Sequence, residues 1–190
     1  GKAISIFQGI KEYLDDSNIM FAQGCDIESN DYSGFDKAVN MAKKADKIIM
    51  VLGEDYNMSG EAASRTNIKL PGIQTQLIKT IRDELPNKPI ILVLMNGRPL
   101  DLTIEDSLAD AILEVWYPGT SGGLGVADIL FGKYNPSAKL PITFPRNLGQ
   151  VPIYYNQKNT GRPISKENPT EDYKSNYIDS PNTPLYPFGH

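Results

Sequence analysis

Two continuous apolar runs limit the folds open to this chain of 190 residues. Residues 47–52 read KIIMVL and residues 90–95 read IILVLM, and neither run alternates between apolar and polar side chains. Strands with apolar side chains on both faces are typical of parallel sheets covered by helices on both sides. A third run, AILEVWY at 111–117, has the same character except that Glu114 interrupts it. These runs predict a layered α/β domain.

Helical patterns lie around the runs. The predicted helices share an apolar face repeated at helical spacing and cover residues 3–14, 35–45, 73–85 and 122–131. Ser33 is the expected cap of the second helix. We also expect short strands at 19–22 and at 139–144, the latter broken at Pro141 and therefore at an edge or bulge. The alternation predicts a three-layer α/β/α sandwich with a mostly parallel sheet and right-handed crossovers.

The last part of the chain differs from the rest. Residues 146–190 hold many of the Pro, Asn, Ser and Tyr residues and show no periodicity. We therefore predict an α/β sandwich domain over 1–145 and an irregular arm over 146–190. The arm either packs on the same domain or reaches toward another domain.

Composition excludes several classes of function. The net charge of −4 and the lack of a basic stripe argue against nucleic-acid binding. No apolar run reaches the length needed to span a membrane. His190 is the single histidine and Cys25 the single cysteine, so triads that need histidine, zinc motifs and an internal disulfide are excluded for this chain. We expect no metal site and no cofactor.

The loop after the strand at 47–52 carries the candidate chemistry. Ligands of parallel α/β sheets bind outside the carboxyl ends of the strands. The loop holds two carboxylates, Glu54 and Glu61, together with Arg65, and Gly53 and Gly60 permit unusual backbone angles. A carboxyl group on such a loop can serve as a general acid. The alternative is that these carboxylates are solvated loop charges.

Several long strings between Met58 and the end of the chain resemble one known family. They are MSGEAASR, LPGIQTQLIKTI, VLMNGRPLDL, WYPGTSGGLGVADILFGKYNPSAKLPITFP, GQVPIYYNQKNTGRP and PLYPFGH. In order and wording they are similar to the C-terminal sandwich domain of glycoside hydrolase family 3. Within that family the chain most resembles the bacterial periplasmic β-glucosidases. The resemblance covers the chain from about Lys47 to its end.

The resemblance implies an activity shared between two domains. It implies retaining hydrolysis of terminal, non-reducing β-D-glucosyl residues of β-glucosides or oligosaccharides, with Glu61 as the general acid/base. It places the nucleophilic Asp on a preceding (β/α)₈ barrel, so this chain alone is expected to be inactive. The position of Glu54 at the strand end implies a structural role, such as accepting hydrogen bonds from turn amides. We expect Glu61 to be exposed on a poorly ordered loop.

The resemblance also carries expectations about the edge of the sheet and the compartment. Full-length relatives open this domain with a strand that this sequence does not show, so we expect the first strand of the family domain to be missing. The sheet then exposes an edge that a homodimer or strand exchange would cover. The family implies a periplasmic or secreted protein, although the chain shows no signal segment.

Three further residues are candidates for binding substrate or ordering the loop. Arg98 follows the strand at 90–95, where it could pair with a carboxylate, and Arg65 lies four residues after Glu61. Trp116 ends a strand and could stack on a sugar ring. The alternatives are a solvated or structural role for each arginine and core packing for the tryptophan.

Two other functions stay open from the residues alone. The chain could act as a stand-alone carbohydrate-binding or interaction module. A nucleotide- or flavin-binding role rests on architecture only. The segment PGTSGGLGVAD matches neither GxGxxG nor GxxxxGK[ST], and close packing of a helix on the sheet explains its small residues.

Overall fold

The computed structural model describes residues 2–158 and 176–190. The chain divides into two compact units. The first comprises Gly1–Arg65, Leu70–Arg98 and Ile104–Ser137, and the second comprises Thr66–Lys69, Pro99–Thr103 and Ala138–His190. Of the predicted arm at 146–190, residues 159–175 lie outside the described residues.

The first unit contains a parallel sheet of three strands in the order β1-β2-β3. The strands are β1 (Ile48–Gly53), β2 (Ile90–Met95) and β3 (Ala111–Glu114). Leu94 is in register with Leu52 on one side and with Glu114 on the other. The three strands predicted from continuous apolar runs are confirmed, because side chains on both faces of the central strand are buried.

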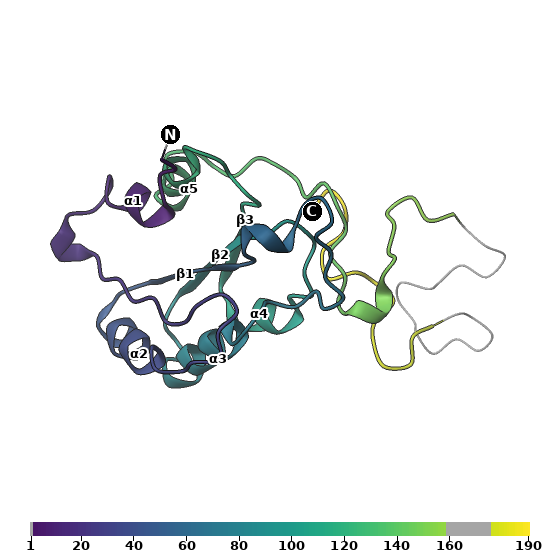
Figure 1. The fold of residues 1–190 in the computed structure, drawn as a ribbon, viewed down its shortest axis with the longest axis horizontal. Helices are drawn as coiled ribbons and strands as arrows, with labels where there is room; N and C mark the ends of the chain where they lie inside the picture. Colours follow the sequence, from purple (N-terminus) through teal and green to yellow (C-terminus); the bar gives the residue numbers. More distant parts are fainter. Residues whose placement is uncertain (1, 159–175) are drawn as a thin grey trace. The chain divides into compact units, whose positions relative to one another are not determined.

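Helices cover both faces of this sheet (Figure 1). They are α1 (Ile6–Ile10), α2 (Phe35–Lys44), α3 (Gln74–Glu84), α4 (Thr103–Leu108) and α5 (Gly122–Leu130). In Figure 1, α1 and α5 lie on one side of the sheet, and α2 and α3 lie on the other. The helix α4 lies on the same side as α3 in Figure 1, as expected for two successive right-handed crossovers in one direction. The predicted α/β sandwich is confirmed.

The apolar cores follow the alternation of side chains along the strands. Val93 of β2 is completely buried and packs in one cluster with Ile6 and Ile10 of α1 and Val126 and Ala127 of α5. Successive side chains of a strand point to opposite faces. The neighbours of Val93 in β2 therefore face the layer of α2 and α3, and these residues, Leu92 and Leu94, are also completely buried.

Two predictions near the beginning of the chain are wrong. Residues 19–22 form no strand. Ile19 has extended backbone angles, but its segment pairs with none of the described strands, and Met20 and Phe21 are exposed. An apolar run shows that a segment is extended or buried, whereas a strand also needs a neighbour to pair with. The first helix ends at Ile10 rather than at Leu14.

The cap of α2 also differs from the prediction. Gly34, not Ser33, is the N-cap residue, and no side chain caps this helix. Both the backbone N–H and the hydroxyl of Ser33 donate to the Asp31 carboxylate. The hydroxyl is therefore used in a local turn one residue before the helix.

The predicted strand at 139–144 is replaced by a single antiparallel bridge between Phe144 and Tyr186 in the second unit. Pro141 lacks the N–H that a continuous ladder would need. The short helix α4 was not predicted, because its six residues carry too little periodicity. No helix in the described part of the chain is long and apolar enough to cross a membrane.

Candidate functional site

The loop of residues 54–65 lies at the carboxyl edge of the sheet. It leaves the end of β1 and includes a short 3₁₀ helix, Tyr56–Met58. The Ser59 hydroxyl donates to the carbonyl of Gly97, which follows β2, over 3.4 Å. Tyr117, which follows β3, donates its hydroxyl to the carbonyl of Asp55 over 3.2 Å. The loop is therefore tied to the ends of both neighbouring strands.

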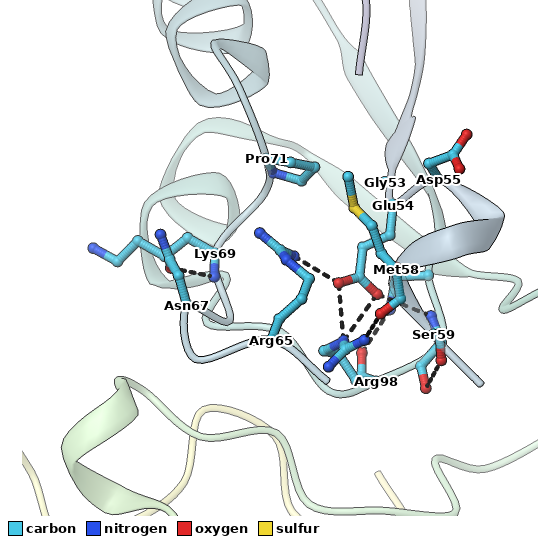
Figure 2. A network of polar contacts seen from close by, with 12 residues as sticks. Gly53, Glu54, Asp55, Met58, Ser59, Arg65, Asn67, Lys69, Pro71 and Arg98 are labelled. Carbon is cyan, nitrogen blue, oxygen red and sulfur yellow. Dashed lines mark hydrogen bonds and ion pairs between the residues drawn. The ribbon is translucent and has the colours of Figure 1, made fainter. Parts of the chain in front are cut away.

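Glu54 holds the base of the loop in a network of ion pairs (Figure 2). Its carboxylate is completely buried. Oε1 lies 2.6 Å from Nη1 of Arg65 and 2.9 Å from Nε of Arg98, and Figure 2 shows both guanidinium groups directed at this carboxylate. The backbone N–H of Glu54 donates to the Met95 carbonyl over 2.8 Å and so extends the pairing of β1 with β2.

Turn amides and carbonyls complete this network. The N–H of Gly97 donates to Oε2 of Glu54 over 3.2 Å, which is the kind of contact expected of this carboxylate. Arg98 donates from its guanidinium to the Met58 carbonyl as well as pairing with Glu54. One arginine thus binds both the beginning and the middle of the loop. A buried carboxylate needs such partners, because an unpaired buried charge is costly.

Two glycines make this close packing feasible. Gly53 has φ of 152°, and a Cβ there would lie 1.9 Å from the Met95 carbonyl oxygen. A Cβ on Gly97 would lie 2.1 Å from the Ser59 hydroxyl oxygen. Any side chain at either position would push the loop away from the strand ends.

Glu61 lies near the tip of the same loop. Its side chain is exposed, as predicted, and within the described ranges it makes no hydrogen bond or ion pair. The backbone around it is turned tightly, since Gly60 and Ala63 form an isolated antiparallel bridge and Ala62 has φ of 56°. Glu61 is thus presented to solvent close to Ser59, which is bound to the turn after β2.

A second carboxylate at this edge, the half-buried Glu114, was not among the candidates from the sequence. Burial raises its pKa to about 7, and the charge of Glu54 contributes in the same direction. Oε1 accepts the N–H of Trp116 over 2.9 Å, and Oε2 accepts Nδ2 of Asn96 over 3.1 Å. The polar residue that interrupts the apolar run at 111–117 was the signal for this group, because a buried strand does not carry a carboxylate without partners.

Trp116 follows β3 at this edge of the sheet. It is half-buried, and its φ of 52° is unusual for a large side chain. The structure therefore brings Glu61, Arg65, Arg98 and Trp116 to one edge of the first unit, on the loop after β1 and the turns after β2 and β3. No group of acidic, cysteine or histidine side chains in residues 2–158 and 176–190 could hold a metal ion.

Comparison with known sequences and structures finds consistent relatives. The model of the family described as "Glycosyl hydrolase family 3 C-terminal domain" matches residues 1–190. A periplasmic β-glucosidase of Salmonella typhimurium is 45% identical, with all of this chain and 27% of the relative covered. A β-xylosidase of Formosa agariphila is 36% identical, covering 98% of this chain and 24% of the relative.

Solved structures show the same fold. The crystal structure of a β-glucosidase from Listeria innocua in complex with isofagomine superposes with a TM-score of 0.91 at 37% identity. It covers 99% of this chain and 26% of that protein. A β-glucosidase from Erythrobacter marinus superposes with a TM-score of 0.83 at 33% identity and covers the whole of this chain. The chain thus spans about a quarter of the length of the relatives it matches.

Proposed function

The chain belongs to the C-terminal domain family of glycoside hydrolase family 3, and on that basis we propose that it supplies the general acid/base of a retaining β-glucosidase. Glu61 is the proposed proton donor. In retaining hydrolysis one carboxylate attacks the anomeric carbon, and the other protonates the leaving oxygen and then deprotonates water. We assign the nucleophile to an Asp on an N-terminal (β/α)₈ barrel of the same protein.

The single observation that supports this role most is the contrast within the loop. Glu61 is exposed at the tip, while Glu54 at the base is completely buried and paired with Arg65 and Arg98. A proton donor must reach its substrate in a fixed geometry. A loop that is fixed at its base by ion pairs can present an exposed carboxyl group at its tip to a second domain. Retaining chemistry then requires roughly 5–5.5 Å between the two carboxyl groups.

The proposed substrate is a β-glucoside cleaved at its non-reducing end. The relatives named above include both β-glucosidases and a β-xylosidase. The relative with 45% identity is a periplasmic β-glucosidase, and this favours glucose and an exported enzyme. Turnover of aryl β-glucosides against aryl β-xylosides by the complete enzyme tests the sugar, and cell fractionation tests the compartment.

A comparison of leaving groups tests the role of Glu61. In the complete enzyme, we expect Glu61→Ala to lower kcat/KM for glucosides with poor leaving groups by roughly 10²–10⁴-fold. Substrates whose leaving group needs no proton should lose much less in the glycosylation step. Glu12→Ala, which removes an exposed carboxylate from another part of the first unit, is the matched control. An equal loss for every leaving group would contradict the assignment.

The isolated chain provides a second test. Without the barrel there is no proposed nucleophile, so the chain should not hydrolyse aryl glucosides. Calorimetry on the same sample separates the alternative. Micromolar binding of glucose or a glucoside by the isolated chain would favour a stand-alone carbohydrate-binding module.

A further inference from the structure

Glu114 accepts hydrogen bonds from the two turns to which the loop carrying Glu61 is bound. We propose that Glu114 is a positioning residue for this loop and that its ionised carboxylate fixes the turns after β2 and β3, to which the loop is bound. The proposal deepens the role suggested for Glu61 and rests on it. Glu114 does not contact the substrate and acts only through its neighbours.

The first connection runs through the turn after β3. Oε1 of Glu114 accepts the N–H of Trp116 over 2.9 Å. Trp116 has φ of 52°, in the left-handed region that is unfavourable for a residue with a side chain. A hydrogen bond from this N–H to a carboxylate offsets that cost. The next residue, Tyr117, donates its hydroxyl to the Asp55 carbonyl of the loop.

The second connection runs through the turn after β2. Asn96 is completely buried, and its Nδ2 donates both to Oε2 of Glu114 over 3.1 Å and to the Arg98 carbonyl over 2.8 Å. Arg98 in turn pairs with Glu54 and donates to the Met58 carbonyl. Glu114 is therefore linked to the base of the loop through Asn96 and Arg98.

The polar atoms around Glu114 explain why its charge matters. Within the described residues, Oδ1 of Asn96 is buried without a hydrogen-bond partner. Ionised Glu114 only accepts hydrogen bonds, so it selects the amide orientation in which Nδ2 points at it. Protonated Glu114 could donate to Oδ1 instead if the amide turned over. Nδ2 would then leave the Arg98 carbonyl, and the second connection would be lost.

The charged groups nearby do not hold Glu114 ionised at every pH. Glu54 faces it from the end of β1 and raises its pKa, and burial raises the pKa further, to about 7. Arg65 and Arg98 are directed at Glu54 rather than at Glu114. The two hydrogen bonds from Trp116 and Asn96 act in the opposite direction and lower the pKa. The contacts of Glu114 should therefore change near neutral pH.

Trp116 is the only tryptophan of the chain, so its fluorescence reports on this site directly. In the 190-residue chain we expect the emission to change with a midpoint near pH 7. The change should disappear in Glu114→Gln, which keeps the size of the side chain and removes its titration. It should persist in Glu12→Gln, the same substitution at an exposed site, and in His190→Asn, which removes the single histidine.

The proposal is overturned if the folded wild-type chain shows no such change in emission. It is also overturned if the change persists in Glu114→Gln or disappears in His190→Asn. The wild-type and His190→Asn titrations keep this test decisive even if Glu114→Gln does not fold. They also need no catalytic activity.

The complete enzyme then links Glu114 to Glu61. We expect Glu114→Gln to lower kcat/KM by roughly tenfold or more for poor leaving groups and less for good ones, because a misplaced donor transfers protons slowly. If Glu61→Ala shows the leaving-group effect and Glu114→Gln does not, only the role of Glu114 fails. If Glu61→Ala itself shows no such effect, the proposed function fails first.

Discussion

The base and the tip of one loop use carboxylates in opposite ways. Glu54 is completely buried and is bound by two arginines and a turn amide, whereas Glu61, seven positions later, is exposed. Burying a charge is tolerated only with such partners. They come from two segments: Arg65 from the end of the loop, and Gly97 and Arg98 from the turn after β2. The base thus determines where the loop lies, and the tip is left free to react. The position and the chemistry of this loop are therefore separable by mutation.

Glu54→Ala should give the largest loss of stability. It would leave the guanidinium groups of Arg65 and Arg98 partly buried without their shared carboxylate, and we expect the free energy of unfolding to fall by roughly 3–5 kcal/mol. Glu61→Ala should change it by less than about 0.5 kcal/mol, because an exposed side chain contributes little. Urea unfolding of both variants measures the contrast. Equal losses would show that the base and the tip are not distinct.

Glu114 is a half-buried carboxylate that forms no ion pair within the described residues, and its effect on stability should depend on pH. Its pKa is raised from 4.5 to about 7, so the folded chain holds the proton more tightly than the unfolded chain. The stabilisation from this proton is complete below about pH 4.5 and is lost as the pH rises through about 7. At 1.36 kcal/mol per unit, the shift from 4.5 to about 7 corresponds to about 3 kcal/mol.

Unfolding free energies at several pH values between 5 and 8 test this contribution. The wild-type chain should lose stability across the interval relative to Glu114→Gln, and the slope should be the same in Glu12→Gln as in the wild type. His190→Asn, which removes the single histidine, is a second control. Parallel slopes for the wild type and Glu114→Gln would show that Glu114 is ionised throughout.

Gly97→Ala tests whether the loop must approach the turn after β2 this closely. The added Cβ would lie 2.1 Å from the Ser59 hydroxyl oxygen, and overpacking of this kind costs about 1–3 kcal/mol. The matched control is Gly125→Ala, where a Cβ meets nothing within 4 Å and an alanine favours the helix. Ser59→Gly should recover part of the loss. No recovery in the double variant would place the strain elsewhere.

The sequence predicted the three strands of the sheet correctly, but it did not predict which extended segments pair with a neighbour. The runs at 47–52 and 90–95 are apolar because both faces of the strands are covered, and this burial is visible in the sequence as a continuous apolar run. The pairing of a strand with its neighbour produces no comparable sequence pattern. The segments at 19–22 and 139–144 have strand-like composition, but the first finds no partner among the described strands and the second forms a single bridge.

The candidate site also contains residues that the sequence could group and residues that only the folded structure brings together. Glu54, Glu61 and Arg65 lie on one loop, so the sequence alone could group them, and the family resemblance could assign different roles to the two carboxylates. The network around Glu114 joins the end of β3 to the turns after β2 and β3. Only the register of β2 with β3 brings Asn96 and Glu114 together, and spacing along the chain does not contain that register.

Tyr117→Phe should give the smallest effect and tests the hydrogen bond between the loop and the turn after β3. The variant keeps the ring and removes only the hydroxyl that donates to the Asp55 carbonyl over 3.2 Å. Tyr117 is 42% exposed, so water can replace the lost donor, and we expect the free energy of unfolding to fall by no more than about 1 kcal/mol.

The same variant tests whether this hydrogen bond helps to position Glu61. If it does, the loss of kcat/KM for poor leaving groups in the complete enzyme, expressed as a free energy, should exceed the loss of unfolding free energy. Tyr134→Phe, which removes an exposed hydroxyl beyond α5, is the control and should change neither. A loss in Tyr117→Phe that is the same for good and poor leaving groups would mean that the base alone positions the tip.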